Sequence, residues 1–172
     1  MVSVKKNFFS PKHQNAHYLY GSLFLILTLL WTVFIFSRSL NNASESTAES
    51  NKVIEIVEKT AETVGIEIED TDSLSAIVRK SAHFIEFGAL GALSFLTLKF
   101  FKLKKRVLIF ISVGYCLVIA CADEYIQTFS SGRSSQVSDI LIDITGSLFT
   151  ICMLLFISFL IKKRKINNRY QS

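Results

Sequence analysis

Four apolar segments of about twenty residues each restrict most strongly what this chain can fold into. A helix rises about 1.5 Å per residue, so about twenty apolar residues cross the ~30 Å hydrocarbon core of a bilayer. We therefore predict an all-α fold, a polytopic bundle of four transmembrane helices in one domain that covers residues 1–172. The predicted membrane helices are listed here with approximate bounds: 18–37, 74–100, 106–127 and 137–161.

The first apolar segment follows Lys5, Lys6 and Lys12, an order similar to that of a secretory signal. However, the run from Tyr18 to Phe36 is longer than the apolar part of a usual signal, and no convincing small-x-small cleavage site follows it. We therefore expect a retained first membrane helix.

The basic and acidic residues are separated along the chain. Thirteen of the 19 Lys and Arg residues lie in the N-terminal tail, the turn at 99–106 and the C-terminal tail, which contain no Asp or Glu. The segment 39–78 contains nine acidic residues against Lys52 and Lys59. The positive-inside rule then predicts both termini in the cytoplasm and residues 38–73 outside. Since orientation and anionic lipid account for the net charge of +5, we do not expect nucleic-acid binding.

The predicted outer segment divides into two parts. Residues 41–51 are small and polar, which is typical of a flexible linker. Residues 52–64 place Val53, Ile54 and Val57 on one helical face and acidic residues opposite, which predicts an extracytoplasmic amphipathic helix. This helix is either a lid over the outer end of the bundle or an ordinary packing helix, and we favour packing.

Ten polar or charged side chains lie at membrane depth or at the predicted outer ends of the helices. Ionisable groups there cost about 2.5–3.5 kcal/mol each on insertion scales, so they persist mainly where they pair, line a cavity or perform a function. Three of them on the second helix recur at i, i+4 and i+7, and therefore share one face. We predict that these ten side chains form one outward-facing polar pocket that binds a ligand: Arg79, Lys80, His83, Glu86, Asp123, Glu124, Gln127, Arg133, Asp139 and Asp143. Arg79, Lys80 and Arg133 are candidate partners for phosphate or carboxylate groups.

Each of these residues also has a structural interpretation. Arg79 and Lys80 are placed to snorkel at a helix boundary. Asp139 is placed to stabilise the first turn of its helix. A single histidine in a membrane helix is more often a packing residue than a ligand. The joint occurrence of so many polar groups on one side favours a functional site. Small residues at Gly146 and Ser147 would let a neighbouring helix approach closely.

Two stretches contain spaced polar motifs. The segment 79–91 contains the pattern K-x-x-H-F-x-E-F, beginning at Lys80. The segment 122–129 contains D-E-x-x-Q-x-F, and G-R and S-D pairs follow at Gly132-Arg133 and Ser138-Asp139. These motifs resemble those of VanZ-like membrane proteins (teicoplanin resistance protein VanZ-like). Members often have Asn where this chain has Asp143, so that position departs from the pattern. The resemblance implies a protein of the bacterial plasma membrane with a role in low-level resistance to teicoplanin, without enzymes that rebuild the peptidoglycan precursor.

Such a pocket suggests three candidate functions. The first and favoured one is binding of a membrane lipid, a lipid-linked envelope precursor or a lipoglycopeptide, without a cofactor or a metal and with no catalytic residue assigned. The second is an outer-leaflet hydrolase or transferase that uses His83 and the carboxylates, with a divalent metal on His83, Glu86 and Asp123 or Glu124 as one version. No recognised catalytic spacing supports it. The third, transport, conflicts with the apolar inner halves of the last three helices.

The three cysteines, Cys116, Cys121 and Cys152, all lie inside apolar runs. We expect them to be small buried residues rather than disulfide partners or metal ligands.

Overall fold

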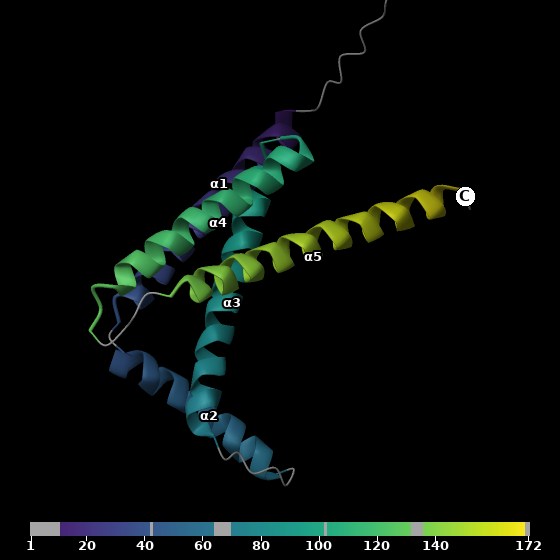
Figure 1. The fold of residues 1–172 in the computed structure, drawn as a ribbon. Helices are drawn as coiled ribbons and strands as arrows, with labels where there is room; N and C mark the ends of the chain where they lie inside the picture. The colour runs from purple at the N-terminus through teal and green to yellow at the C-terminus, as the bar shows by residue number, and fades with distance from the viewer. Residues whose placement is uncertain (1–10, 42, 64–69, 102, 132–135, 171–172) are drawn as a thin grey trace, which may run out of the picture.

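The computed structural model describes residues 11–41, 43–63, 70–101, 103–131 and 136–170. Within these ranges the regular structure is entirely helical (Figure 1). Four of the helices are long and apolar enough to cross a membrane, and α2 is the exception. This confirms the predicted all-α fold with four candidate spans. The helices are α1 (Pro11–Ser39), α2 (Ala43–Thr63), α3 (Thr71–Lys99), α4 (Lys105–Gln127) and α5 (Val137–Tyr170).

The flexible linker predicted for residues 41–51 is wrong for residues 43–51, which form the first half of α2. The segment has no Gly or Pro to interrupt a helix, and its Ala and Glu residues favour one. The apolar face predicted for residues 52–64 is only partly used, because Ile54 is buried whereas Val53 and Val57 are exposed. Val64 lies outside the described residues.

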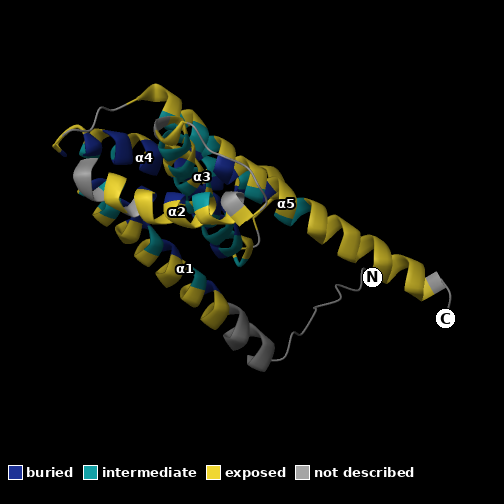
Figure 2. Cartoon of the chain, turned by 90° about the horizontal axis from the view of Figure 1, so that it is seen from below, coloured by how far each residue is buried: buried dark blue, intermediate teal, exposed yellow. Residues whose placement is uncertain are grey.

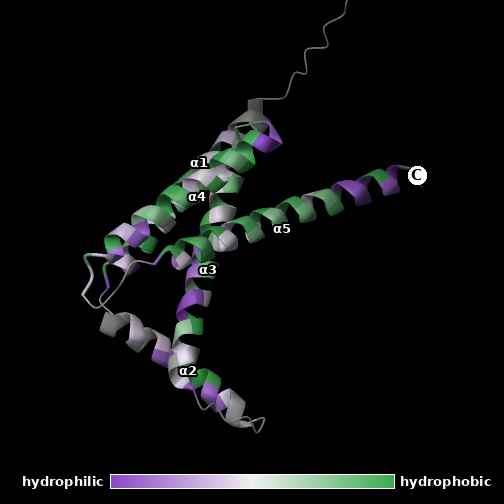
Figure 3. Cartoon of the chain, in the orientation of Figure 1, coloured by the Kyte–Doolittle hydropathy of each residue, from purple (hydrophilic) through white to green (hydrophobic). Residues whose placement is uncertain are grey.

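The bundle is organised around α3, which packs against each of the other four helices. Figure 2 shows the buried residues concentrated where the helices meet, while the C-terminal half of α5 is exposed. The core contains Phe87 and Leu90 of α3, Ile35 of α1, and Cys116 and Ala120 of α4. Figure 3 shows hydrophobic residues along α1, α4 and α5 and hydrophilic ones at the end of α5. The exposed apolar side chains of these helices suit contact with lipid.

Close contact between α3 and α5 depends on small residues, as predicted from Gly146 and Ser147. A Cβ atom on Gly146 would lie 2.2 Å from the carbonyl oxygen of Phe84, so only glycine fits there without a shift. One residue later, the Ser147 hydroxyl donates a hydrogen bond of 3.0 Å to the carbonyl oxygen of Phe87. On α3, a Cβ atom on Gly91 would lie 2.9 Å from the Ser147 backbone. The two backbones are therefore nearly in contact, which fixes the register of α5 on α3.

Hydrogen bonds between side chains attach α1 to the bundle. The hydroxyl oxygens of Thr28 and Thr97 lie 3.0 Å apart, and the hydroxyl oxygens of Thr32 and Tyr115 lie 2.7 Å apart. Polar contacts of this kind associate membrane helices because lipid offers no competing donor or acceptor. They place the C-terminal end of α1 beside the ends of α3 and α4 that carry the polar residues.

The prediction for the cysteines is correct for one of the three. Cys116 is buried, whereas Cys121 and Cys152 are exposed on the outer surface of the helices. An apolar run does not distinguish a side chain that faces another helix from one that faces lipid, which explains the error.

Candidate functional site

A cavity of about 370 Å³ lies between α1, α2, α3 and α4. Its lining residues come from the C-terminal ends of α1 and α4, from the N-terminal half of α3 and from α2. Helix α2 packs on α3 and contributes Ser46, Ser50, Lys52 and Val53 to the cavity lining. The polar lining of the cavity consists of Arg38, Ser39, Ser46, Ser50, Lys52, Arg79, His83, Glu86, Asp123 and Gln127. Its apolar lining consists of Ile35, Val53, Val78 and Ala82.

Helix α3 contributes the residues whose helical spacing predicted a shared face. Arg79, His83 and Glu86 all line the cavity. The helix begins after Asp70, whose carboxylate accepts a hydrogen bond of 3.0 Å from the backbone N–H of Ser73. Lys80 comes one residue after Arg79, which turns it by about 100° around the helix. It borders a separate, mostly apolar hollow between α3 and α5 instead.

Asp123 of α4 is buried and lines the cavity, and α1 supplies part of its environment. The hydroxyl group of Ser39 donates a hydrogen bond to one carboxylate oxygen, and the Gln127 amide nitrogen donates to the other at 2.8 Å. The carbonyl oxygen of Ser39 accepts a hydrogen bond of 2.7 Å from the Ser130 hydroxyl. These bonds fix the Asp123 carboxylate in one orientation, since both of its oxygens are engaged.

Arg38 and Ser39 are site residues that the sequence prediction missed. The Arg38 guanidinium lies 2.8 Å from the Glu86 carboxylate through its Nε atom. The indole N–H of Trp31 donates a hydrogen bond of 2.9 Å to the carbonyl oxygen of Glu86, which holds this part of α3 against α1. A signal was present in the sequence: Arg38 ends an apolar run on the predicted outer side, where the positive-inside rule disfavours a basic residue. A partner carboxylate in the bundle explains why it occurs there.

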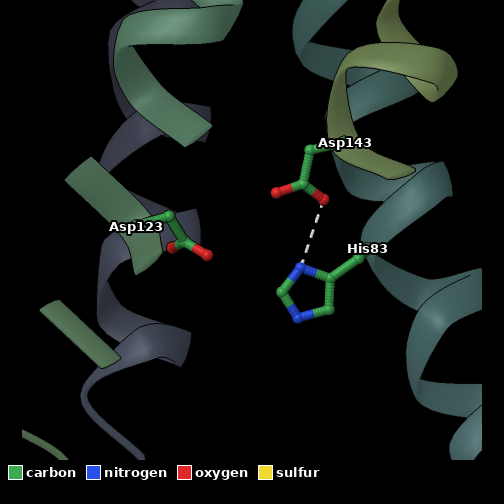
Figure 4. A group of neighbouring side chains, drawn as sticks. All are labelled: His83, Asp123 and Asp143. Atoms are coloured by element: carbon green, nitrogen blue, oxygen red, sulfur yellow. Dashed lines mark ion pairs between the residues drawn. The ribbon is translucent and has the colours of Figure 1, made fainter. Parts of the chain in front are cut away.

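His83, Asp123 and Asp143 approach one another from three helices, as Figure 4 shows. His83 Nδ1 lies 3.3 Å from Asp143 Oδ1. One ligand atom from each of the three residues lies within 4.8 Å of the other two. The Asp143 side chain is 0% exposed. Asp143 therefore belongs to the group formed with His83 and Asp123, although it does not line the cavity itself.

The remaining predicted site residues lie elsewhere or are not described. Glu124 is buried and accepts a hydrogen bond of 2.8 Å from the backbone N–H of Gln136, which links α4 to the start of α5. Asp139 is half-buried, and its carboxylate lies 3.3 Å from the Ser138 hydroxyl. Neither residue lines the cavity. Arg133 lies outside the described residues.

The sequence was also compared with known proteins. A family model described as VanZ/LLP1 matches residues 24–160. The chain belongs to the VanZ/LLP1 family. This confirms the resemblance drawn from the motifs. No curated protein and no solved structure matches the chain significantly. Every residue that lines the cavity falls inside the VanZ/LLP1 match, so the cavity is built within the family's domain.

Proposed function

We propose that this protein spans the bacterial plasma membrane several times, with both termini in the cytoplasm and with the cavity open to the outside. The charge distribution supports this orientation, since the turn between α3 and α4 and both tails are basic. The cavity lies at the opposite ends of α3 and α4 from that turn. It is then reached from the outer surface of the membrane.

The cavity binds the headgroup of a membrane lipid or of a lipid-linked envelope precursor. The observation that carries this function is the presence of both signs of charge in one cavity bordered by membrane helices. Arg38, Lys52 and Arg79 provide donors for phosphate or carboxylate groups. Glu86 and Asp123 offer acceptors for amines or sugar hydroxyls, and the apolar lining suits the start of an acyl chain.

The same site gives a route to low-level resistance of the teicoplanin type. Teicoplanin carries an acyl chain that lies in the membrane, so its polar part meets the outer leaflet at the depth of the cavity. A protein that binds the antibiotic or its lipid-linked target there interferes with its action without modifying the target.

The adjacent residues Arg79 and Lys80 provide a matched test of this function. Both are exposed basic residues of α3, but only Arg79 lines the cavity. We expect expression of the protein to raise the minimal inhibitory concentration of teicoplanin in a susceptible Gram-positive host. Arg79→Ala should return it to the value of the empty vector, because a donor to the ligand is lost. Lys80→Ala should retain the full increase.

The control for this experiment is the amount of each variant in the membrane fraction, measured by immunoblot. At equal amounts, unchanged tolerance in the Arg79 variant contradicts a function of the cavity. An equal loss in both variants indicates a general effect of surface charge, and it also contradicts the proposal.

A second candidate function is an outer-leaflet hydrolase or transferase that acts on a lipid headgroup. The proximity of His83 to two carboxylates favours it, because such a group supplies a general base with orienting partners. Incubation of the purified protein with lipids labelled in the headgroup separates the two functions. Release or transfer of the label indicates an enzyme, whereas retention of intact lipid indicates binding.

A further inference from the structure

We propose that His83, Asp123 and Asp143 form a binding site for a divalent transition-metal ion, with Zn²⁺ as the representative ion. The chemistry of the donors fits, since one imidazole nitrogen and two carboxylate oxygens are ligands that Zn²⁺ takes in proteins. The geometry fits as well. A point equidistant from three atoms 4.8 Å apart lies about 2.8 Å from each, and small side-chain movements shorten this to the roughly 2.0–2.2 Å of zinc bonds.

Asp143 provides a separate indication of a bound cation. Its side chain is fully buried, and neither carboxylate oxygen accepts a hydrogen bond from the described part of the chain. A carboxylate at this depth is costly to bury unless it is paired, hydrogen-bonded or bound to a metal. Its ion-pair partner in the described chain is His83, whose Nδ1 atom lies 3.3 Å away and also makes no hydrogen bond within that part of the chain. A cation between these groups would satisfy all of these atoms together.

The other acidic residues of the region have different roles. Glu86 meets Arg38 at 2.8 Å, and Glu124 accepts a hydrogen bond from Gln136 at 2.8 Å. The ligand set weighed from the sequence, His83 with Glu86 and Asp123 or Glu124, is therefore replaced. Asp143 takes the place of Glu86, because the close approach of α5 to α3 brings Asp143 to His83.

The surroundings of Asp123 match what metal ligands require. Ser39 and Gln127 each donate a hydrogen bond to its carboxylate and so fix its direction. Partners of this kind hold ligands in place, and their loss typically lowers metal affinity about 10- to 100-fold. His83 and Asp123 also line the cavity. A fourth coordination position would therefore be open to water or to an oxygen of a bound headgroup, as in zinc sites with three protein ligands.

The metal site goes beyond the proposed function and does not depend on it. Zn²⁺ binding is measured on the purified protein in detergent without teicoplanin or added lipid. Failure of this measurement leaves the tolerance experiment unaffected, and the converse also holds.

The experiment titrates Zn²⁺ into the full chain purified with a tag that contains no histidine. The background carries His13→Gln and His17→Gln, which removes the only other imidazoles of the sequence. We expect one Zn²⁺ per chain by calorimetry and by elemental analysis after dialysis. X-ray absorption should show one imidazole and otherwise oxygen ligands. His83→Ala and Asp143→Asn should each weaken binding at least tenfold, and Gln127→Leu about 10- to 100-fold.

Asp139→Asn is the matched control, because it removes a carboxylate one turn before Asp143 on the same helix. It should bind Zn²⁺ as the background does. Absence of saturable Zn²⁺ binding by the background protein overturns the proposal whatever the variants do. Sulfur ligands in the absorption spectrum overturn it as well, as does unchanged affinity in His83→Ala.

Discussion

Gly146→Ala is expected to destabilise the protein by about 1–3 kcal/mol, the usual cost of forcing extra atoms into a packed interior. The new methyl group would lie 2.2 Å from the carbonyl oxygen of Phe84 and 3.0 Å from its carbonyl carbon. These are backbone atoms of a neighbouring helix, so no side-chain rotation relieves the contact. Helix α5 must move away from α3. Unfolding in detergent micelles with increasing SDS, followed by circular dichroism, measures the effect.

Gly114 of α4 is the matched control for this substitution. A Cβ atom there meets nothing within 4 Å, so Gly114→Ala gains only the higher helix propensity of alanine, which is about 1 kcal/mol. We expect the control to be neutral or stabilised. Equal destabilisation by the two substitutions would show that α3 and α5 do not approach each other as described.

Gly146→Ala should also disturb the cluster of His83, Asp123 and Asp143. Phe84 follows His83 directly, and Gly146 lies three residues after Asp143, about one turn along the same face of α5. Separation of the two backbones at this point increases the distance between His83 and Asp143. Gly146→Ala should therefore weaken Zn²⁺ binding more than Gly114→Ala does.

Arg38→Met is expected to have the second large effect, a destabilisation of about 1–3 kcal/mol. Removing one partner of a fully buried ion pair costs about 3–5 kcal/mol, but the Arg38 side chain is 34% exposed, and solvent screens part of the interaction. Methionine keeps the apolar stem of the side chain, so the effect reports the charge. Loss of the Arg38 charge removes this cation from Glu86, whose side chain is only 16% exposed.

A double-mutant cycle isolates the interaction from other consequences of the substitution. Once Arg38 is methionine, Glu86→Gln should restore part of the lost stability, because the buried charge is removed. Contacting residues of this kind typically show a coupling energy of about 0.5–3 kcal/mol. Additive effects of the two substitutions would mean that Arg38 and Glu86 do not interact, and that the wall between α1 and α3 is built differently.

Periodicity in the sequence was sufficient for part of this structure. Apolar runs predicted the four candidate spans, and the spacing of Arg79, His83 and Glu86 predicted three side chains in one cavity. Both properties depend only on the geometry of a single helix. The prediction also included Lys80, because it considered how deep each residue lies in the membrane but not which way its side chain points. Adjacent residues on a helix point about 100° apart, and Lys80 borders the other hollow.

Contributions from other helices were beyond the reach of this reasoning. Ser39 is the last residue of the mostly apolar helix α1, and its contact with Asp123 exists only because α1 packs beside α4. Ser50 lies in a segment that was expected to be a linker. The pairing of His83 with Asp143, rather than with Glu86 on its own helix, depends on how α5 crosses α3.

Labelling of single cysteines in intact cells tests most directly whether the cavity is open to the outside. In a variant without Cys116, Cys121 and Cys152, Ala82→Cys places a thiol in the cavity lining, and Ile85→Cys places one on the exposed outer face of α3. Leu103→Cys marks the turn between α3 and α4. A membrane-impermeant maleimide should label position 82 in intact cells, position 103 only after permeabilisation, and position 85 in neither case. Labelling of position 82 only after permeabilisation, together with labelling of position 103 in intact cells, would contradict an outward-facing cavity.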